Sequence, residues 1–230
     1  MKVAIIGGAG AEGIGLALRL ARAGHQVVIA SRSLERARAA AERVRNTLEG
    51  RGTPAGSILV EGTLNAQVGQ EDVVVLSIPY HAHHGTLSAL GGLSDGSVVV
   101  DLTVPLIPGR WYGTFPAEGQ SACEEAQQVL GDRCPVVGAF HTMSAHLLVD
   151  LDRSVDSDVL ICGDSQAAKD KVAALARSVG IRPVDVGELR MARTVERITP
   201  LLVSLNIRYR SRIAGIRITG IDVGNAGQGA

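Results

Sequence analysis

The chain has 230 residues, of which 46% are hydrophobic and 20% charged, so it has the material for a large core and lacks the composition of a disordered protein. Its 23 basic and 23 acidic residues cancel, and only 3% of its residues are aromatic. These values argue against a nucleic-acid-binding surface, which needs a basic face and stacking rings. No apolar run reaches the roughly 18 residues of a membrane span. We therefore expect the protein to bind neither nucleic acid nor a membrane.

The cysteines predict a reducing compartment. Cys123, Cys134 and Cys162 are odd in number and none has CxxC spacing, so we expect three buried thiols rather than disulfides or a structural zinc site. Glycines at 7, 8 and 10 interrupt the apolar N-terminal stretch, which is therefore not typical of a signal peptide. We expect a cytoplasmic protein.

The first hundred residues alternate between strand and helix patterns. An apolar strand over 2–6 is followed by a helix over 13–23, a strand over 26–30 and an amphipathic helix over 33–45. The same alternation then predicts strands over 57–60, 72–78 and 97–102, with a helix over 82–90. Such βαβ repetition indicates a parallel sheet with helices on both faces.

The second half continues the alternation after a long loop. Residues 103–120 contain three prolines and three glycines and predict a loop of a length that is often functional. Further elements are expected as helices over 121–130 and 166–179 and strands over 135–140, 159–162 and 182–186. Leu189–Arg212 predicts a helix that is kinked or broken at Pro200. We therefore predict an α/β fold, a Rossmann-like doubly wound, mainly parallel sheet over 1–187, with a small C-terminal helical appendage over 188–230.

A glycine-rich motif follows the first strand. Gly8, Gly10 and Gly13 form GxGxxG, in which the strand turns sharply and a helix begins. The backbone of such a turn approaches a pyrophosphate closely, and the helix N-terminus supplies amide donors. The alternative is a glycine-rich turn without a ligand.

The end of the second strand favours NADP over NAD. An NAD-binding protein usually carries an acid there for the ribose hydroxyls, but this chain has Ser31 and Arg32. Arg36 follows one helical turn later, so the three residues predict a cradle for a 2′-phosphate. The alternative for Arg36 is a solvated charge on the helix surface.

Together with these motifs, further blocks of sequence resemble the NADPH-dependent reductases of coenzyme F420. The similar segments are residues 3–10, 13–21, 77–80, 139–142 and 193–201, and the similarity runs nearly end to end. The resemblance implies hydride transfer between C4 of NADP(H) and C5 of the deazaflavin coenzyme F420, in a homodimer whose C-terminal segment helps to enclose the F420 pocket.

The resemblance also implies roles for individual residues. The pyrophosphate would contact Gly8, Ala9, Gly10, Ala11 and Glu12, and the dinucleotide would run along Ile78 and Pro79. His141, Met143, Arg193 and Thr199 would line the deazaflavin side, with His141 and Thr199 as the catalytic pair, and Ala145 would meet the nicotinamide carboxamide. The alternatives are a satisfied core histidine for His141 and an ordinary helix face for Arg193 and Thr199.

Charge and histidine content bear on the ligands. Between residues 182 and 217 the chain carries eight arginines and three acidic residues. This positive charge fits the binding of an anionic coenzyme or, alternatively, a solvated helix. His81, His83 and His84 lack cysteine or carboxylate partners at ligand spacing, so we expect no metal site.

Two other functions remain open: an NADP-dependent reductase of imine or ferric substrates, and a non-catalytic NADPH-sensing module. The sequence leaves the direction of hydride transfer undetermined.

Overall fold

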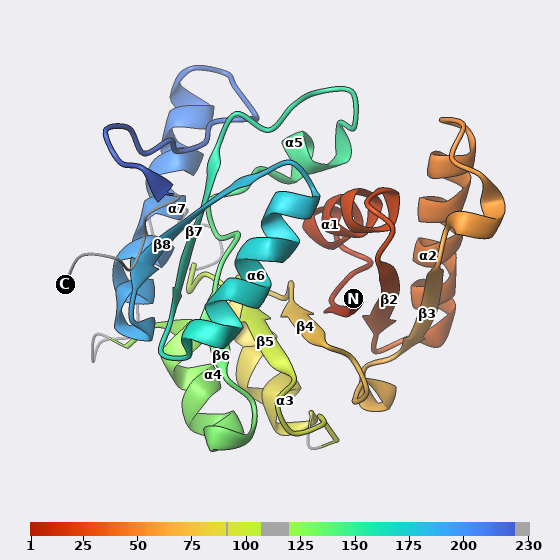
Figure 1. Ribbon diagram of the computed structural model, residues 1–230, viewed down its shortest axis with the longest axis horizontal. Coiled ribbons are helices and arrows are strands. Elements are labelled where there is room, and N and C mark those ends of the chain that lie inside the picture. Colours follow the sequence, from red (N-terminus) through yellow and green to blue (C-terminus); the bar gives the residue numbers. More distant parts are fainter. Residues whose placement is uncertain (91, 107–119, 224–230) are drawn as a thin grey trace.

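The computed structural model describes residues 1–90, 92–106 and 120–223, which form an eight-stranded sheet with helices on both faces (Figure 1). The strand order is β3-β2-β1-β4-β5-β6-β7-β8. The strands are β1 (Lys2–Ile6), β2 (Gln26–Ser31), β3 (Val60–Leu64), β4 (Val73–Leu76), β5 (Val98–Asp101), β6 (Val136–Gly138), β7 (Asp158–Gly163) and β8 (Arg182–Gly187). All neighbours are parallel except β6 and β7, so the predicted mainly parallel, doubly wound sheet is confirmed.

Two helical layers cover the sheet. The helices are α1 (Ala11–Arg22), α2 (Leu34–Glu49), α3 (His83–Ser88), α4 (Ala122–Leu130), α5 (Ala145–Val149), α6 (Gln166–Ser178) and α7 (Ala192–Arg208). α1, α2, α5 and α6 pack in the larger core cluster, whereas α3, α4 and the start of α7 pack in the second cluster. Successive residues of a strand point to opposite faces, so Val3 and Ile5 belong to the first cluster and Ala4 and Ile6 to the second. Within the described residues no helix has both the length and the apolarity to cross a membrane.

The reversal at β7 determines where α7 begins. β7 is antiparallel to β6, and β8 is parallel to β7. The chain therefore leaves β8 at the edge of the sheet opposite the carboxyl ends of β1–β6. α7 then returns along the sheet beside β8, at the side of the molecule away from α2 (Figure 1). It reaches the carboxyl edge, where Glu196 meets the start of α4 and Thr199 bonds to the backbone of His141.

The segment after α7 is fastened to the start of β7. Asp158, which is fully buried, accepts two hydrogen bonds from Arg182 at 2.7 and 2.6 Å and one from the backbone N–H of Ile218 at 2.6 Å. Ile216, Ile218 and Val223 pack with α7 and β8 in a third apolar cluster. The C-terminal segment therefore packs directly against the sheet.

Some sequence-based boundaries were wrong. The strand expected over 57–60 lies at Val60–Leu64, because the sheet register pairs Val27 with Val60 and a short 3-10 turn occupies Ala55–Ser57. α5 was not predicted. α7 ends at Arg208 rather than 212 and continues through Pro200, which is buried, without a break. Most of the loop expected over 103–120 lies outside the described residues, which include its positions 103–106 and 120.

Candidate functional site

Three connected pockets line the carboxyl edge of the parallel strands, where open α/β sheets bind ligands. Their volumes are about 490, 440 and 350 Å³. The first and second share Ser31, Arg32, Asn65, Ala82 and Thr86, and the second and third share Gly10, Ser77, Ile78 and Pro79. Together they form one groove that passes from the end of β2 over the glycine loop to α7.

Glycine is sterically required in the loop between β1 and α1. Gly7 has a positive φ of 77°, and a Cβ atom there would lie 2.1 Å from the carbonyl oxygen of Ser77. A Cβ on Gly13 would lie 2.5 Å from the Cα of Gly8. Gly10 caps α1 without a side-chain hydrogen bond, so the first N–H groups of the helix are left for a ligand. The predicted phosphate loop is therefore built as the motif requires.

The cationic end of the groove lies at the end of β2. Arg32 and Arg36 are exposed and line the second pocket together with Ser31. Ser33 caps α2 by accepting a hydrogen bond from the backbone N–H of Arg36 at 3.3 Å, which fixes the start of the helix that carries this arginine. The side-chain oxygen of Asn65 is buried in this region and has no hydrogen-bond partner. Two guanidinium groups thus line this pocket, and a buried acceptor without a partner belongs to another of its lining residues, which fits a phosphorylated nucleoside.

The third pocket is mainly apolar. It extends from Gly10, Ala11 and Glu12 to Met143 and Thr199, and its other lining residues are Ser77, Ile78, Pro79, Leu102, Val104, Leu106 and His141. Phe140, just before His141, has a φ of 64°, which is rare for a bulky residue and typical of a strained turn at a functional site. This turn directs the chain out of β6 and into the pocket wall.

His141 is held from two sides. Its carbonyl accepts a hydrogen bond from the Thr199 hydroxyl at 2.9 Å, and its Nε2 lies 3.6 Å from the Cys123 sulfur. Burial lowers the pKa of His141 to about 4, so the imidazole is neutral at physiological pH. Its Nδ1 is buried without a partner. The ring can therefore offer one hydrogen bond but brings no charge.

Glu12 is an acid in an unusual place. It lies in the first turn of α1 and lines the third pocket next to the phosphate loop. Burial raises the pKa of its carboxyl to about 8, so it is largely protonated at neutral pH. A neutral carboxylic acid is compatible with an anionic ligand beside it.

The structure brings most of the predicted residues together. Ala9, Gly10, Ala11, Glu12, Ser31, Arg32, Arg36, Ile78, Pro79, His141, Met143 and Thr199 all line the second or third pocket. Gly8 is buried beneath the loop, and a Cβ there would lie 2.8 Å from the Ile5 carbonyl oxygen. Ala145 starts α5, two residues beyond Met143, and does not line these pockets.

Arg193 lies outside the three pockets. Its guanidinium makes three hydrogen bonds, of 2.7 to 3.1 Å, to the carboxylate of Glu124 and so ties α7 to α4. The predicted contact between Arg193 and a coenzyme therefore stays a prediction, while its contact with Glu124 gives it a structural role.

Several lining residues were not singled out from the sequence. Leu102 was expected at the end of a strand, and Val104 and Leu106 lie in the described start of the expected loop over 103–120, whose length and its prolines and glycines were the only signal. Asn65 and Thr86 come from short segments after β3 and within α3 and carry no motif.

The three neighbouring histidines at positions 81, 83 and 84 lie in different surroundings. His83 begins α3, is buried and lies 2.6 Å from the carboxylate of Asp101 through its Nε2. His81 lines the second pocket, and His84 is exposed. The predicted burial of the three cysteines is confirmed.

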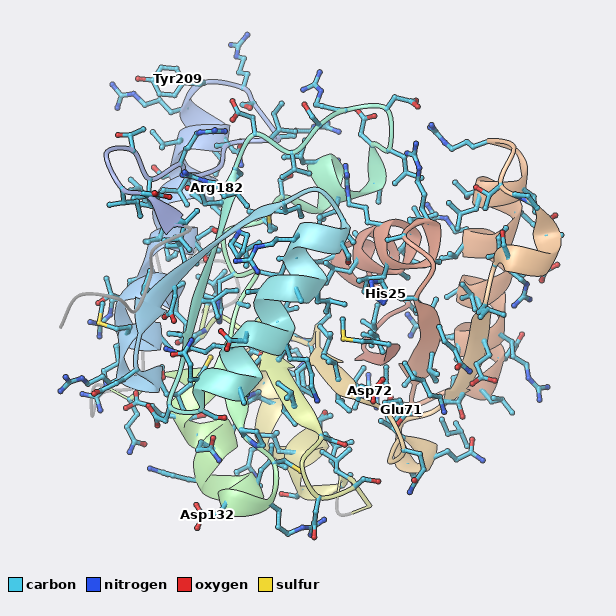
Figure 2. All side chains as sticks on the ribbon, viewed as in Figure 1. His25, Glu71, Asp72, Asp132, Arg182 and Tyr209 are labelled. Atoms are coloured by element: carbon cyan, nitrogen blue, oxygen red, sulfur yellow. The ribbon has the colours of Figure 1, made fainter. Side chains whose placement is uncertain are left out.

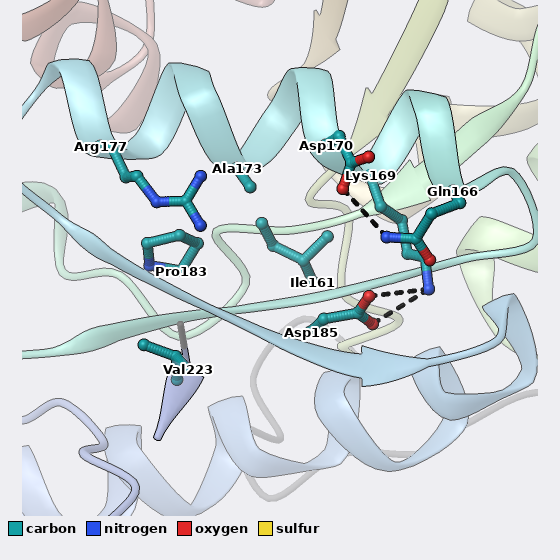
Figure 3. A pocket seen from close by; sticks show the side chains of 9 residues that line it. All are labelled: Ile161, Gln166, Lys169, Asp170, Ala173, Arg177, Pro183, Asp185 and Val223. Atoms are coloured by element: carbon teal, nitrogen blue, oxygen red, sulfur yellow. Dashed lines mark hydrogen bonds and ion pairs between the residues drawn. The ribbon is translucent and has the colours of Figure 1, made fainter. Parts of the chain in front are cut away.

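A separate cavity of about 150 Å³ lies between α6 and β8 (Figure 3). Lys169 is the buried cation there, and the carboxylate of Asp185 neutralises it at 2.9 Å. The charge of this lysine is therefore compensated within the protein.

The fold and the groove define a protein of the Rossmann type, with a glycine loop at the start of α1, two arginines near the end of β2 and an adjoining apolar pocket. Residues 2–105 match the family model described as NADP oxidoreductase, coenzyme F420-dependent. The chain is 42% identical to the F420-dependent NADP reductase of Methanocaldococcus jannaschii, over 97% of this chain and 100% of the relative. It is 40% identical to the enzyme of that name from Methanothermobacter marburgensis, over 96% of this chain and 99% of the relative.

A solved structure agrees with these relatives. A candidate F420-dependent NADP reductase from Arthrobacter sp. FB24 superimposes with a TM-score of 0.78 at 28% identity, over 96% of this chain and 100% of that one. The chain belongs to the family of F420-dependent NADP reductases.

Proposed function

We propose that this protein transfers a hydride between C4 of the nicotinamide of NADP(H) and C5 of the deazaflavin coenzyme F420. The observation that carries the proposal is the continuous groove, which joins a dinucleotide-shaped site to a second, apolar pocket. In one direction NADPH, the oxidised deazaflavin and one proton give NADP⁺ and the reduced deazaflavin. The reverse reaction uses the same positions.

The dinucleotide half of the groove would hold NADP(H). The N–H groups at the start of α1 would bind the pyrophosphate, with Gly8 allowing the close approach, and Arg32 and Arg36 would hold the 2′-phosphate. The nicotinamide would then lie along Ile78 and Pro79, with its carboxamide toward Ala145. This arrangement directs the reactive face of the ring into the third pocket.

The third pocket would hold the deazaflavin ring. Hydride transfer needs two carbons held about 3–3.5 Å apart in a dry site, and the coenzymes carry the chemistry. Leu102, Val104 and Met143 would exclude water. Because the Thr199 hydroxyl donates its proton to the His141 carbonyl, it can only accept a hydrogen bond from the ring, while His141 offers its free Nδ1. We assign these two residues to orienting the deazaflavin, and residues 188–230 to enclosing its pocket.

We further propose a cytoplasmic homodimer that buries the outer side of α7. Among the described residues nine large apolar side chains are exposed, and six of them fall between Met191 and Ile221. Leu201 and Ile207 are 58% and 57% exposed on α7, and Tyr209 projects beyond its end (Figure 2). Clustered exposed apolar residues mark association surfaces.

The proposal is tested by mixing the protein with NADPH and oxidised coenzyme F420 and following the visible absorbance of the deazaflavin. We expect a fast NADPH-dependent bleach and a much slower one with NADH. Thr199→Ala should raise the KM for coenzyme F420 and leave the KM for NADPH nearly unchanged. Thr47→Ala, near the end of α2 and outside the three pockets, should change neither.

Two outcomes would lead to other functions. NADPH binding with no deazaflavin bleach would contradict the proposal and favour a reductase of imine or ferric substrates, to be assayed with those acceptors. NADPH binding without turnover of any acceptor would favour the sensing module.

A further inference from the structure

Three potential metal ligands meet behind the wall of the third pocket. Cys123 lies in the first turn of α4, His141 follows β6 and Glu196 lies on α7. Their exposed fractions are 0%, 4% and 0%, and one ligand atom from each lies within 4.8 Å of the other two. The topology thus brings a thiol, an imidazole and a carboxyl from three distant segments into one buried cluster.

The spacing suits a transition metal. Zinc binds cysteine sulfur at about 2.3 Å and histidine nitrogen at about 2.0–2.1 Å, so two such ligands of one tetrahedral ion lie about 3.6 Å apart. The distance between the Cys123 Sγ and the His141 Nε2 is 3.6 Å. A thiolate, an imidazole and a carboxylate are also the three side-chain ligand types that zinc accepts.

The carboxyl of Glu196 favours a cation in the cluster. It is fully buried, and the backbone N–H groups of Ala122 and Cys123, which are neutral, donate hydrogen bonds to it at 3.1 and 3.3 Å. The carboxylate of the nearby Asp101 is paired with His83 at 2.6 Å, and the backbone carbonyl oxygen of Asp101 lies 3.7 Å from the Cys123 sulfur. A buried carboxylate such as that of Glu196 is costly unless a cation or a proton compensates it.

The surroundings of the cluster are tightly packed and hold its members in place. A Cβ atom on Gly138 would lie 3.0 Å from the Cys123 sulfur, 2.8 Å from the Cys162 sulfur and 3.3 Å from Cε1 of His141, so only glycine fits against these side chains. The hydrogen bonds from the start of α4 orient Glu196, as outer contacts orient ligands in metal sites.

We propose that Cys123, His141 and Glu196 bind one divalent transition metal ion of the zinc class. A metal on Nε2 would place the imidazole proton on Nδ1, the atom that lacks a partner, and would so make His141 a hydrogen-bond donor. The inference does not depend on the proposed hydride transfer. It departs from the expectation of no metal, which rested on the odd number and spacing of the cysteines and on the neighbouring histidines 81, 83 and 84.

Metal content and a thiolate signature test the site. The full-length chain is loaded with Zn²⁺ or Co²⁺ and desalted, and the metal per chain is measured by mass spectrometry. We expect about one equivalent and, with Co²⁺, a thiolate-to-cobalt charge-transfer band. Cys123→Ala should remove the band and weaken Co²⁺ binding about tenfold or more. Cys134→Ala is the matched control, because this buried thiol bonds to the Ser94 carbonyl away from the cluster.

A second variant keeps the test decisive if Cys123→Ala is unstable. Glu196→Gln retains an acceptor for the amides of α4 but lacks the charge, and it should also weaken Co²⁺ binding. NADPH binding by each variant checks that it is folded. A folded wild-type chain that retains no metal and shows no thiolate band would overturn the proposal, as would a band of equal strength in Cys123→Ala.

Discussion

Arg32 offers the sharpest test of coenzyme choice at the level of single residues. Its guanidinium is exposed at the end of β2 and lines the pocket assigned to the 2′-phosphate. A hydrogen bond to a charged group contributes about 1.5–3 kcal/mol, so Arg32→Ala should weaken NADPH binding about 10- to 100-fold. Binding of NADH, which lacks this phosphate, should change little. The measurement is the dissociation constant of each dinucleotide by fluorescence titration.

The control for this prediction is Arg38→Ala, since Arg38 is an exposed arginine of α2, the helix that follows Arg32, and lines none of the three pockets of the groove. Equal losses of NADPH and NADH affinity in Arg32→Ala would remove the 2′-phosphate assignment.

Glu12 predicts a pH dependence of dinucleotide binding. Because burial raises its pKa to about 8, the side chain loses its proton and gains a negative charge as the pH rises through that value. A unit charge at about 4 Å contributes about 1 kcal/mol even in water, so NADP⁺ should bind about fivefold more weakly at about pH 9 than at about pH 7. Calorimetric titration at both pH values measures this change in the dissociation constant of NADP⁺.

The Glu12→Gln variant should bind NADP⁺ equally at both pH values. Glu49 is an exposed acid at the far end of α2, so Glu49→Gln should keep the pH dependence of the wild type. A wild-type pH dependence of NADP⁺ affinity in Glu12→Gln would show that another group titrates.

Single residues were predictable where their signal is local. The glycine loop and Ser31–Arg32 could be placed at the groove from the sequence, because a strand, a turn and a helix follow one another within a few residues of the chain. Leu102, Val104 and Asn65 could not, because they reach the groove only through the pairing of strands far apart in sequence. The pairing of Arg193 with Glu124 is likewise a contact between segments 69 residues apart.

At the scale of elements, the contact between α1 and α5 depends on Gly15. A Cβ atom at this position would lie 2.5 Å from the Cβ of Leu148, so the two helices approach more closely than any larger residue permits. Gly15→Ala should force them apart and lower the free energy of unfolding by about 1–3 kcal/mol. Urea denaturation monitored by circular dichroism measures the change.

Gly56→Ala is the matched control, because a Cβ atom there meets nothing within 4 Å, and it should change stability by less than about 0.5 kcal/mol. A Gly15→Ala protein as stable as wild type would mean that α5 moves freely on α1.

Elements with a long, regular pattern were predicted well, and short or reversed ones were not. α5 has five residues and so offers too few turns for a periodicity to show. The antiparallel pairing of β6 and β7 leaves no trace in the hydrophobic pattern, because a strand buried on both faces reads alike in either direction. α7 was predicted as a helix, but its continuation through Pro200 depends on packing against the sheet.

For the whole molecule, the apolar outer side of α7 predicts the oligomeric state. Leu201→Glu would place a charge in the proposed dimer interface and should convert the dimer to a monomer in sedimentation-velocity experiments. Leu59→Glu should leave the dimer intact, since Leu59 is similarly exposed, at 53%, on another part of the molecule. A monomeric wild-type chain, or a dimer unaffected by Leu201→Glu, would exclude this interface.

The return of α7 to the carboxyl edge also bears on how the protein matures during synthesis. Chains fold from the N-terminus as they leave the ribosome. The phosphate loop and Arg32 emerge early, whereas Thr199 follows more than 150 residues later, and its hydrogen bond to His141 joins the third pocket to α7. The residues of the dinucleotide half of the groove are therefore synthesised before the α7 wall of the third pocket. A chain that ends before α7 would lack the Thr199 hydroxyl that bonds to His141.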